Sequence, residues 1–199
     1  MSGGFDALVQ VMKVMQKLTQ DEIRKRFETS KEFNEIFDAF QNALAQRMND
    51  IELYRQLFWN HALAPAERCL FGEKLAKEFP DLAYDVFMWL ANVFEVTNAM
   101  YDNYDLALEY YKKAADNKPW EHAPYTAAAN CYEPDINIPS LSYLTEFLKK
   151  GTRTVREPQK IYERLAYFYD LSGNDEMSMF YRRKIDESRR PPQPPPPAP

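Results

Sequence analysis

The chain has 199 residues, of which 45% are hydrophobic, and a formal net charge of −5 at pH 7. This composition can build the packed core of one domain and differs from that of a disordered chain. The negative charge argues against general nucleic-acid binding, which needs a basic face to neutralise phosphates. Only five glycines occur, and no Asn-Gly or Asp-Gly pair signals a hairpin, so an all-α fold is predicted.

The first 50 residues contain two amphipathic stripes and are predicted to form an N-terminal helical extension. Apolar residues recur at three- and four-residue steps over 5–18 and again over 33–44. The first stripe fits a helix that packs on its own domain or one that binds a partner. Acidic residues dilute its cationic face, which argues against a membrane surface. No apolar run has the form of a signal peptide or reaches the ~20 residues of a membrane span, so a soluble cytoplasmic protein is expected.

Capping residues and prolines predict where the helices begin and end. Thr19 with Glu22, and Thr29 with Glu32, have the spacing of capping boxes. Asp50 is suited to cap the next helix. Proline suits a first helical turn at four positions, Pro65, Pro124, Pro139 and Pro158. The helices predicted after residue 50 span 51–63, 65–78, 82–101, 105–116, 124–132, 140–150, 158–171 and 174–188.

A short pattern occurs three times between residues 90 and 169. Two small or aliphatic residues are followed three positions later by an aromatic, as Leu90-Ala91 with Phe94, Ala128-Ala129 with Tyr132, and Leu165-Ala166 with Tyr169. The aromatic positions are 38 and 37 residues apart. A period of this size indicates a stacked array of helix pairs. Such arrays present a binding surface more often than a catalytic pocket.

Over residues 84–190 this pattern resembles the tetratricopeptide repeat family, whose units have two antiparallel helices with small residues where the helices cross. The matching positions are Leu90, Ala91, Phe94, Ala107, Tyr111, Ala114 and Pro119, then Tyr125, Ala129, Tyr132 and Gly151, then Tyr162, Leu165, Ala166, Tyr169, Gly173 and Ser178. Leu144 and Arg182 depart from the pattern. The resemblance implies an all-α, right-handed α-solenoid of antiparallel helix pairs over 51–188. Residues 51–80 are a candidate for a further degenerate pair that crosses at Cys69 and Ala76.

The resemblance also implies that the first helices of successive units line a concave groove. Asn92 and Asn130 lie at equivalent points of two of these helices, and Lys160 and Arg164 share one face of a third. Some members of the family hold the C-terminal carboxylate of a partner peptide with such residues. Two positions of that clamp are not matched, Met88 and Ala127. The four residues are therefore either contacts for an acidic or C-terminal segment of a partner, or ordinary solvated side chains.

Residues 189–199 form a proline-rich tail. Arg189, Pro192 and Pro195 place a basic residue before the PxxP spacing that SH3-type domains accept. The tail is either disordered or a docking arm, and one form of such an arm folds back onto the groove. Tyrosines such as Tyr167 are abundant; most of them are predicted to lie in the core, and a minority could line the groove.

Signals for catalysis, cofactors and metals are sparse. His61 and His122 do not have the spacing of metal ligands. Cys69 and Cys131 are interpreted as buried, reduced thiols, and no nucleotide-binding or nucleophile motif occurs. The predicted function is a non-catalytic adaptor or scaffold, without cofactor or metal, that binds a peptide or helix of another protein. The alternatives are a structural subunit of a larger assembly, and an enzyme whose pocket joins a histidine to carboxylates.

Overall fold

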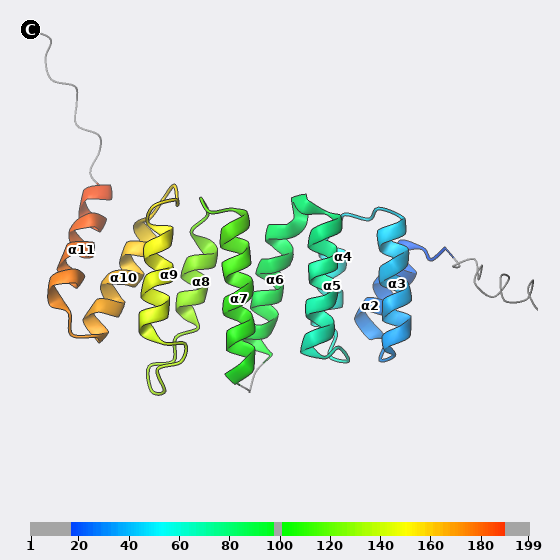
Figure 1. Cartoon of the computed structure of the whole chain (residues 1–199). Helices are drawn as coiled ribbons and strands as arrows, with labels where there is room; N and C mark the ends of the chain where they lie inside the picture. The colour runs from blue at the N-terminus through cyan, green and yellow to red at the C-terminus, as the bar shows by residue number, and fades with distance from the viewer. Residues whose placement is uncertain (1–16, 98–100, 190–199) are drawn as a thin grey trace, which may run out of the picture. The chain divides into compact units, whose positions relative to one another are not determined.

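The computed structural model describes residues 17–97 and 101–189, and within these ranges it is all-α (Figure 1). The helices are α2 (Gln20–Thr29), α3 (Phe33–Ala45), α4 (Ile51–Trp59), α5 (Pro65–Glu78), the 3-10 helix η1 (Pro80–Leu82), α6 (Ala83–Val96), α7 (Tyr101–Asn117), α8 (Ala123–Asn130), α9 (Leu141–Gly151), α10 (Gln159–Leu171) and α11 (Asp175–Arg189). The chain divides into two compact units, Met1–Leu90 and Ala91–Pro199. The predicted division of the chain at residues 50 and 188 stays a prediction, as does the right-handed sense of the array.

One of the two predicted capping boxes is confirmed. At the start of α2, Thr19 accepts a hydrogen bond from the Glu22 backbone N–H, and the Thr19 backbone N–H donates to the Glu22 carboxylate at 2.8 Å. The second box is wrong. The Thr29 hydroxyl donates to the Lys25 carbonyl at 2.8 Å inside the last turn of α2, so it does not cap α3.

Two predicted helices end four or five residues earlier than their apolar pattern suggested. Asp50 caps α4 as predicted, but the helix stops at Trp59 and not at residue 63. Asn60 adopts an extended backbone there, and its side-chain carbonyl accepts from the Ala62 N–H. In the same way α6 ends at Val96, five residues before the predicted end. The hydroxyl of Thr97 donates back to a carbonyl one turn earlier, which competes with helix continuation.

The first unit is built on an aromatic core between α2, α3, α4 and α5. Phe40 packs edge-on against Phe71 of α5 with ring centroids 4.8 Å apart, and Phe27 lies 6.1 Å from Tyr54 of α4. α5 approaches α6 closely at Gly72, where an added Cβ would overlap a methyl group of Leu90. The small residue at this crossing is therefore Gly72, which the sequence pattern did not single out.

Buried polar groups join three helices of the first unit. Arg68 of α5 donates to the carbonyls of Phe58 and Asn60 at 3.0 and 2.9 Å. The Asn60 side-chain amide donates to the Phe27 and Ser30 carbonyls at 2.8 and 3.0 Å. Carbonyls at the ends of α2 and α4 have no partner within their own helices, and these side chains supply the missing donors. Burial lowers the pKa of the Arg68 guanidinium.

The second unit is a set of helix pairs in two layers, with α8 and α10 in one layer and α7 and α9 in the other (Figure 1). The small residues of the repeat lie inside it: Ala91, Ala129 and Ala166 are all buried, as predicted. Gly151 ends α9, and a Cβ there would lie 2.8 Å from Ile161 and 2.9 Å from Tyr125. Small side chains at these points let the helices nest without separation of their axes.

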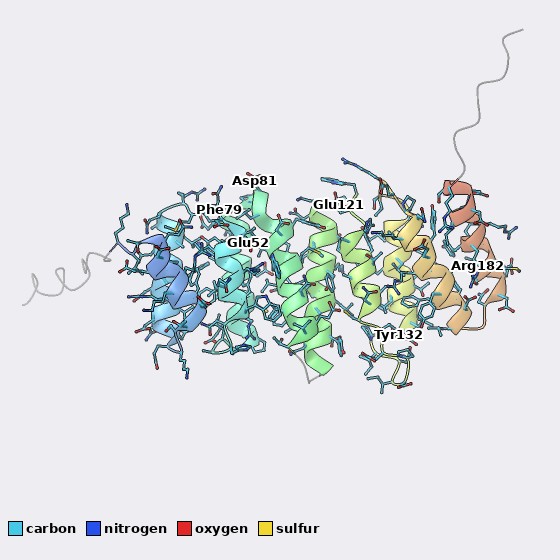
Figure 2. All side chains as sticks on the ribbon, turned by 180° about the vertical axis from the view of Figure 1, so that it is seen from behind. Glu52, Phe79, Asp81, Glu121, Tyr132 and Arg182 are labelled. Atoms are coloured by element: carbon cyan, nitrogen blue, oxygen red, sulfur yellow. The ribbon has the colours of Figure 1, made fainter. Side chains whose placement is uncertain are left out.

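An aromatic stack and an ion pair connect α10 to α11. Tyr169 of α10 stacks on Tyr181 of α11 with ring centroids 5.8 Å apart. Arg182, labelled in Figure 2, departs from the repeat pattern because it pairs with Asp170 across the two helices at 2.5 Å. Gly173 turns the chain between them with φ of 69°, a conformation that glycine adopts without strain.

Candidate peptide-binding site

A pocket of about 380 Å³ opens between α8 and α10 in the second unit. The pocket is lined by Thr126 and Asn130 of α8 and by Lys160, Glu163, Arg164 and Tyr167 of α10. Three of the four residues predicted for the groove are therefore brought together. Two helices that are separate in sequence supply them because α8 and α10 lie side by side.

The α10 side of the pocket is one face of a regular helix. Lys160, Arg164 and Tyr167 follow one another at steps of four and three residues, which places them in a single row. On the adjoining face of the helix, Leu165 and Phe168 are buried in the core. The packing of these two residues fixes the rotation of α10 and aims the row at the pocket.

Among the described residues, the two cations of the pocket have no ion-pair partner. Lys160 is exposed and Arg164 half-buried, and neither makes a hydrogen bond or ion pair with any residue in 17–97 or 101–189. The lining carboxylate, Glu163, is already engaged. It accepts a hydrogen bond from Gln159 at 3.0 Å and pairs with Arg189 of α11 at 3.5 Å. The pocket therefore presents net positive charge.

Asn92, the fourth predicted groove residue, does not line this pocket. It is half-buried in α6, and the Tyr111 hydroxyl lies 2.8 Å from its side-chain oxygen. The same hydroxyl donates to the Glu95 carboxylate. Burial is the main cause that raises the pKa of Tyr111, followed by the hydrogen bond to Glu95. Asn92 thus takes part in a partly buried polar cluster that joins α6 to α7.

Sequence reasoning missed three lining residues. Tyr167 was not distinguished from the tyrosines of the core, yet 45% of its surface is exposed and it lines the pocket. Its position seven residues after Lys160 is the signal that could have placed it on the binding face. Thr126 and Glu163 carried no distinguishing pattern. Of the predicted tail residues, Arg189 ends α11 beside the pocket, whereas Pro192 and Pro195 lie outside the described residues.

Two further pockets have different chemistry. One of about 580 Å³ lies between α7, α9 and the loop before α9, and its lining includes Asp105, Lys112 and the exposed Tyr143. The other, of about 280 Å³, lies at the end of α5 near Phe79 and Asp81 (Figure 2). Its cation, Arg47, pairs with Glu78 at 3.6 Å and lies over the Phe79 ring.

The two histidines and the two cysteines do not line these pockets. His61 is exposed in the turn after α4, and neither it nor His122 lines any of the three. Burial raises the pKa of the Cys131 thiol to about 12, which opposes formation of the reactive thiolate. Cys69 is half-buried, not buried as predicted. Within the described residues no three His, Cys, Asp or Glu side chains are placed to hold a metal ion.

Comparison with protein-family models gives no match, and neither does comparison with curated proteins. One solved structure, titled MamA MSR-1 C2, aligns with 85% of this chain and 95% of its own at 18% identity and a TM-score of 0.45. A TM-score this low carries no argument, so the all-α helical array is assigned from the helices of this structure alone. No helix in the described part of the chain is both long and apolar enough to cross a bilayer.

Proposed function

We propose that this chain is a protein-interaction scaffold of the tetratricopeptide-like type, and that the α8–α10 pocket holds an acidic or C-terminal segment of a partner protein. One observation carries the proposal. Asn130, Lys160 and Arg164 converge on one pocket while the two cations have no partner among the described side chains. Cations with unused donors at a pocket are the arrangement that recognises carboxylates.

The lining side chains divide the recognition between them. Arg164 offers a planar fork of donors that matches a carboxylate, and Lys160 adds a second positive charge at the exposed edge. The Asn130 amide can donate to a peptide carbonyl. The Tyr167 ring supplies apolar area with few rotors to freeze on binding. Each charge-assisted hydrogen bond is worth about 1.5–3 kcal/mol.

Charge reversal at the pocket tests the proposal. Lys160→Glu combined with Arg164→Glu should abolish binding of a fluorescein-labelled tetraglutamate peptide, measured by anisotropy, while the helical circular-dichroism signal is unchanged. The matched control is Arg153→Glu with Arg183→Glu, which makes the same change in net charge at exposed positions outside the pocket lining. The control should bind as the parent does. Binding that survives in the pocket variant would exclude this site.

The proposal extends to the proline-rich tail, to a non-catalytic role and to the cellular location of the protein. The PxxP spacing of Pro192 and Pro195 supports a contact with an SH3-type domain of a second partner. The raised pKa of the buried Cys131 thiol supports a role without nucleophilic catalysis. A reduced thiol also supports a cytoplasmic location. Together these features favour an adaptor that recruits proteins and performs no reaction.

A structural subunit is the second candidate, and one observation favours it. Leu171, Met179 and Phe180 of the last helix pair are exposed large apolar residues. A stacked array leaves such residues without a neighbour at its end unless another subunit covers them. Size-exclusion chromatography with light scattering separates the two roles. An isolated monomer favours the scaffold, and obligate association favours the structural subunit.

A further inference from the structure

The chain leaves its last helix at the edge of the α8–α10 pocket. Arg189 is the final residue of α11, and its guanidinium lies 3.5 Å from the carboxylate of Glu163. Glu163 itself lines the pocket, and Gln159 holds the same carboxylate from one turn earlier. The segment 190–199, in which seven of the ten residues are proline, therefore starts beside the pocket.

We propose that residues 190–199 of this chain dock in the α8–α10 pocket and compete there with the partner segment. The inference rests on the proposed function only in that both ligands share one site. It adds a regulatory property, because a pocket occupied by its own tail opens only to a partner that binds more strongly.

The chemistry of the tail suits the pocket without charge pairing. Prolines favour the polyproline II conformation, which makes no internal hydrogen bonds and leaves its carbonyls free. Asn130, Lys160 and Arg164 supply donors for such carbonyls, and the exposed ring of Tyr167 supplies a surface for proline rings. The tail has no acidic side chain. An acidic partner would therefore make stronger contacts with the two cations and could displace it.

The tail is long enough for this docking. A polyproline II segment extends ~3.1 Å per residue, so ten residues reach about 31 Å. Packed helices such as α8 and α10 are about 8–10 Å apart. A short tether gives an effective concentration on the order of millimolar. A tail contact with an intrinsic Kd on the order of 0.1 mM would thus keep the pocket closed most of the time and weaken a competing ligand by roughly tenfold.

A spin label on the tail tests where it lies in the full chain. Ala198→Cys carries the nitroxide in a Cys69→Ser background, and circular dichroism verifies that the helices are retained. The proposal expects the nitroxide to broaden the NMR signals of the Asn130 side-chain amide and the Arg164 Nε–H, with recovery after reduction of the label. Broadening restricted to the end of α11, or found at Asn137 of the α7–α9 pocket, would overturn it.

Two tyrosine variants show whether the pocket is responsible. Tyr167→Ser should abolish the broadening at Asn130. Tyr143→Ser is the matched control, because Tyr143 and Tyr167 are 44% and 45% exposed but line different pockets. The control should leave the broadening unchanged. Equal broadening in both variants would show that an undocked tail approaches Asn130 only transiently, and the proposal would be wrong.

Competition is measured with the same tetraglutamate probe. A full-length variant with serine at positions 192, 194, 195 and 196 should bind the probe severalfold more tightly than the parent. Equal affinity in the two chains would overturn docking in this pocket. If the probe binds neither chain, the proposed function fails, and the spin-label experiment still decides where the tail docks.

Discussion

The guanidinium group occurs in two opposite environments in this chain, at Arg68 in the first unit and at Arg164 in the second unit. Arg68 is buried in α5, and its donors are used by the carbonyls of Phe58 and Asn60. Arg164 is half-buried on α10 at the rim of a pocket, and no described residue accepts from it. The first arginine completes helix ends and serves folding. The second has unused donors and is available to a ligand.

The two arginines differ in the acceptors that their N–H groups reach. A buried guanidinium without acceptors would be strongly destabilising, so Arg68 is held by two carbonyls. A pocket cation without a partner keeps part of its hydration and can exchange that water for a carboxylate. Loss of each arginine should therefore affect a different measurement. Substitution of Arg68 should lower stability, whereas substitution of Arg164 should lower binding.

The largest expected effect is on stability at Arg68. Arg68→Met leaves the Phe58 carbonyl without its side-chain donor and the Asn60 carbonyl with only the Leu63 backbone N–H. We expect the free energy of unfolding to fall by about 3 kcal/mol. Urea denaturation followed by circular dichroism measures this change. Arg164→Met is the control and should stay within about 0.5 kcal/mol of the parent. Similar losses of unfolding free energy in the two variants would contradict the distinction between the two arginines.

The next effect is steric and concerns the second unit. Gly151→Ala inserts a methyl group 2.8 Å from Ile161 and 2.9 Å from Tyr125. This overpacking should cost about 1–3 kcal/mol, measured by thermal or urea unfolding. Gly173→Asn is the matched control, because no atom lies within 4 Å of an added Cβ there and asparagine tolerates a positive φ. A fully stable Gly151→Ala variant would show that the helices do not need close approach at this point.

The smallest effect is at the helix start of the first unit. Thr19→Ala removes an N-cap and should cost about 1 kcal/mol. The backbone N–H of Thr19 and then its hydroxyl hold the pKa of Glu22 below its ordinary value of 4.5. A lowered folded-state pKa stabilises the chain above 4.5, and this stabilisation is lost as pH falls through the folded-state value. Thr19→Ala keeps the backbone N–H and removes only the contribution of the hydroxyl to the lowered pKa of Glu22. The stability difference between Thr19→Ala and the parent should therefore narrow slightly in acid, as urea curves at neutral and acidic pH would show.

Features set by local residue size and capping could be predicted from the sequence. The buried Ala91, Ala129 and Ala166 and the turn at Gly173 followed from the repeat. Helix ends were less predictable, because the side chains of Thr29 and Asn60 form local hydrogen bonds that compete with the apolar period.

The candidate site depended on contacts between distant parts of the chain. Lys160 and Arg164 were found by their spacing on one helix. Asn92 was predicted beside them from its place in the repeat, equivalent to that of Asn130. Its hydrogen-bond partner Tyr111, 19 residues away in sequence, could not be inferred. The ion pair between Glu163 and Arg189 likewise joins two helices and appears only in three dimensions. The packing of helices determines which side chains form such pairs, and a pattern read along the sequence does not show that packing.

The central claim is that unused donors at the α8–α10 pocket bind a carboxylate-bearing segment. The most direct measurement is an NMR titration of the full chain with tetraglutamate, following the Asn130 side-chain amide and the Arg164 Nε–H. The account predicts saturable shifts at both groups and at least a tenfold loss of affinity in Arg164→Met, which corresponds to about 1.4 kcal/mol. Shifts confined to the α7–α9 pocket, or unchanged affinity in Arg164→Met, would contradict it.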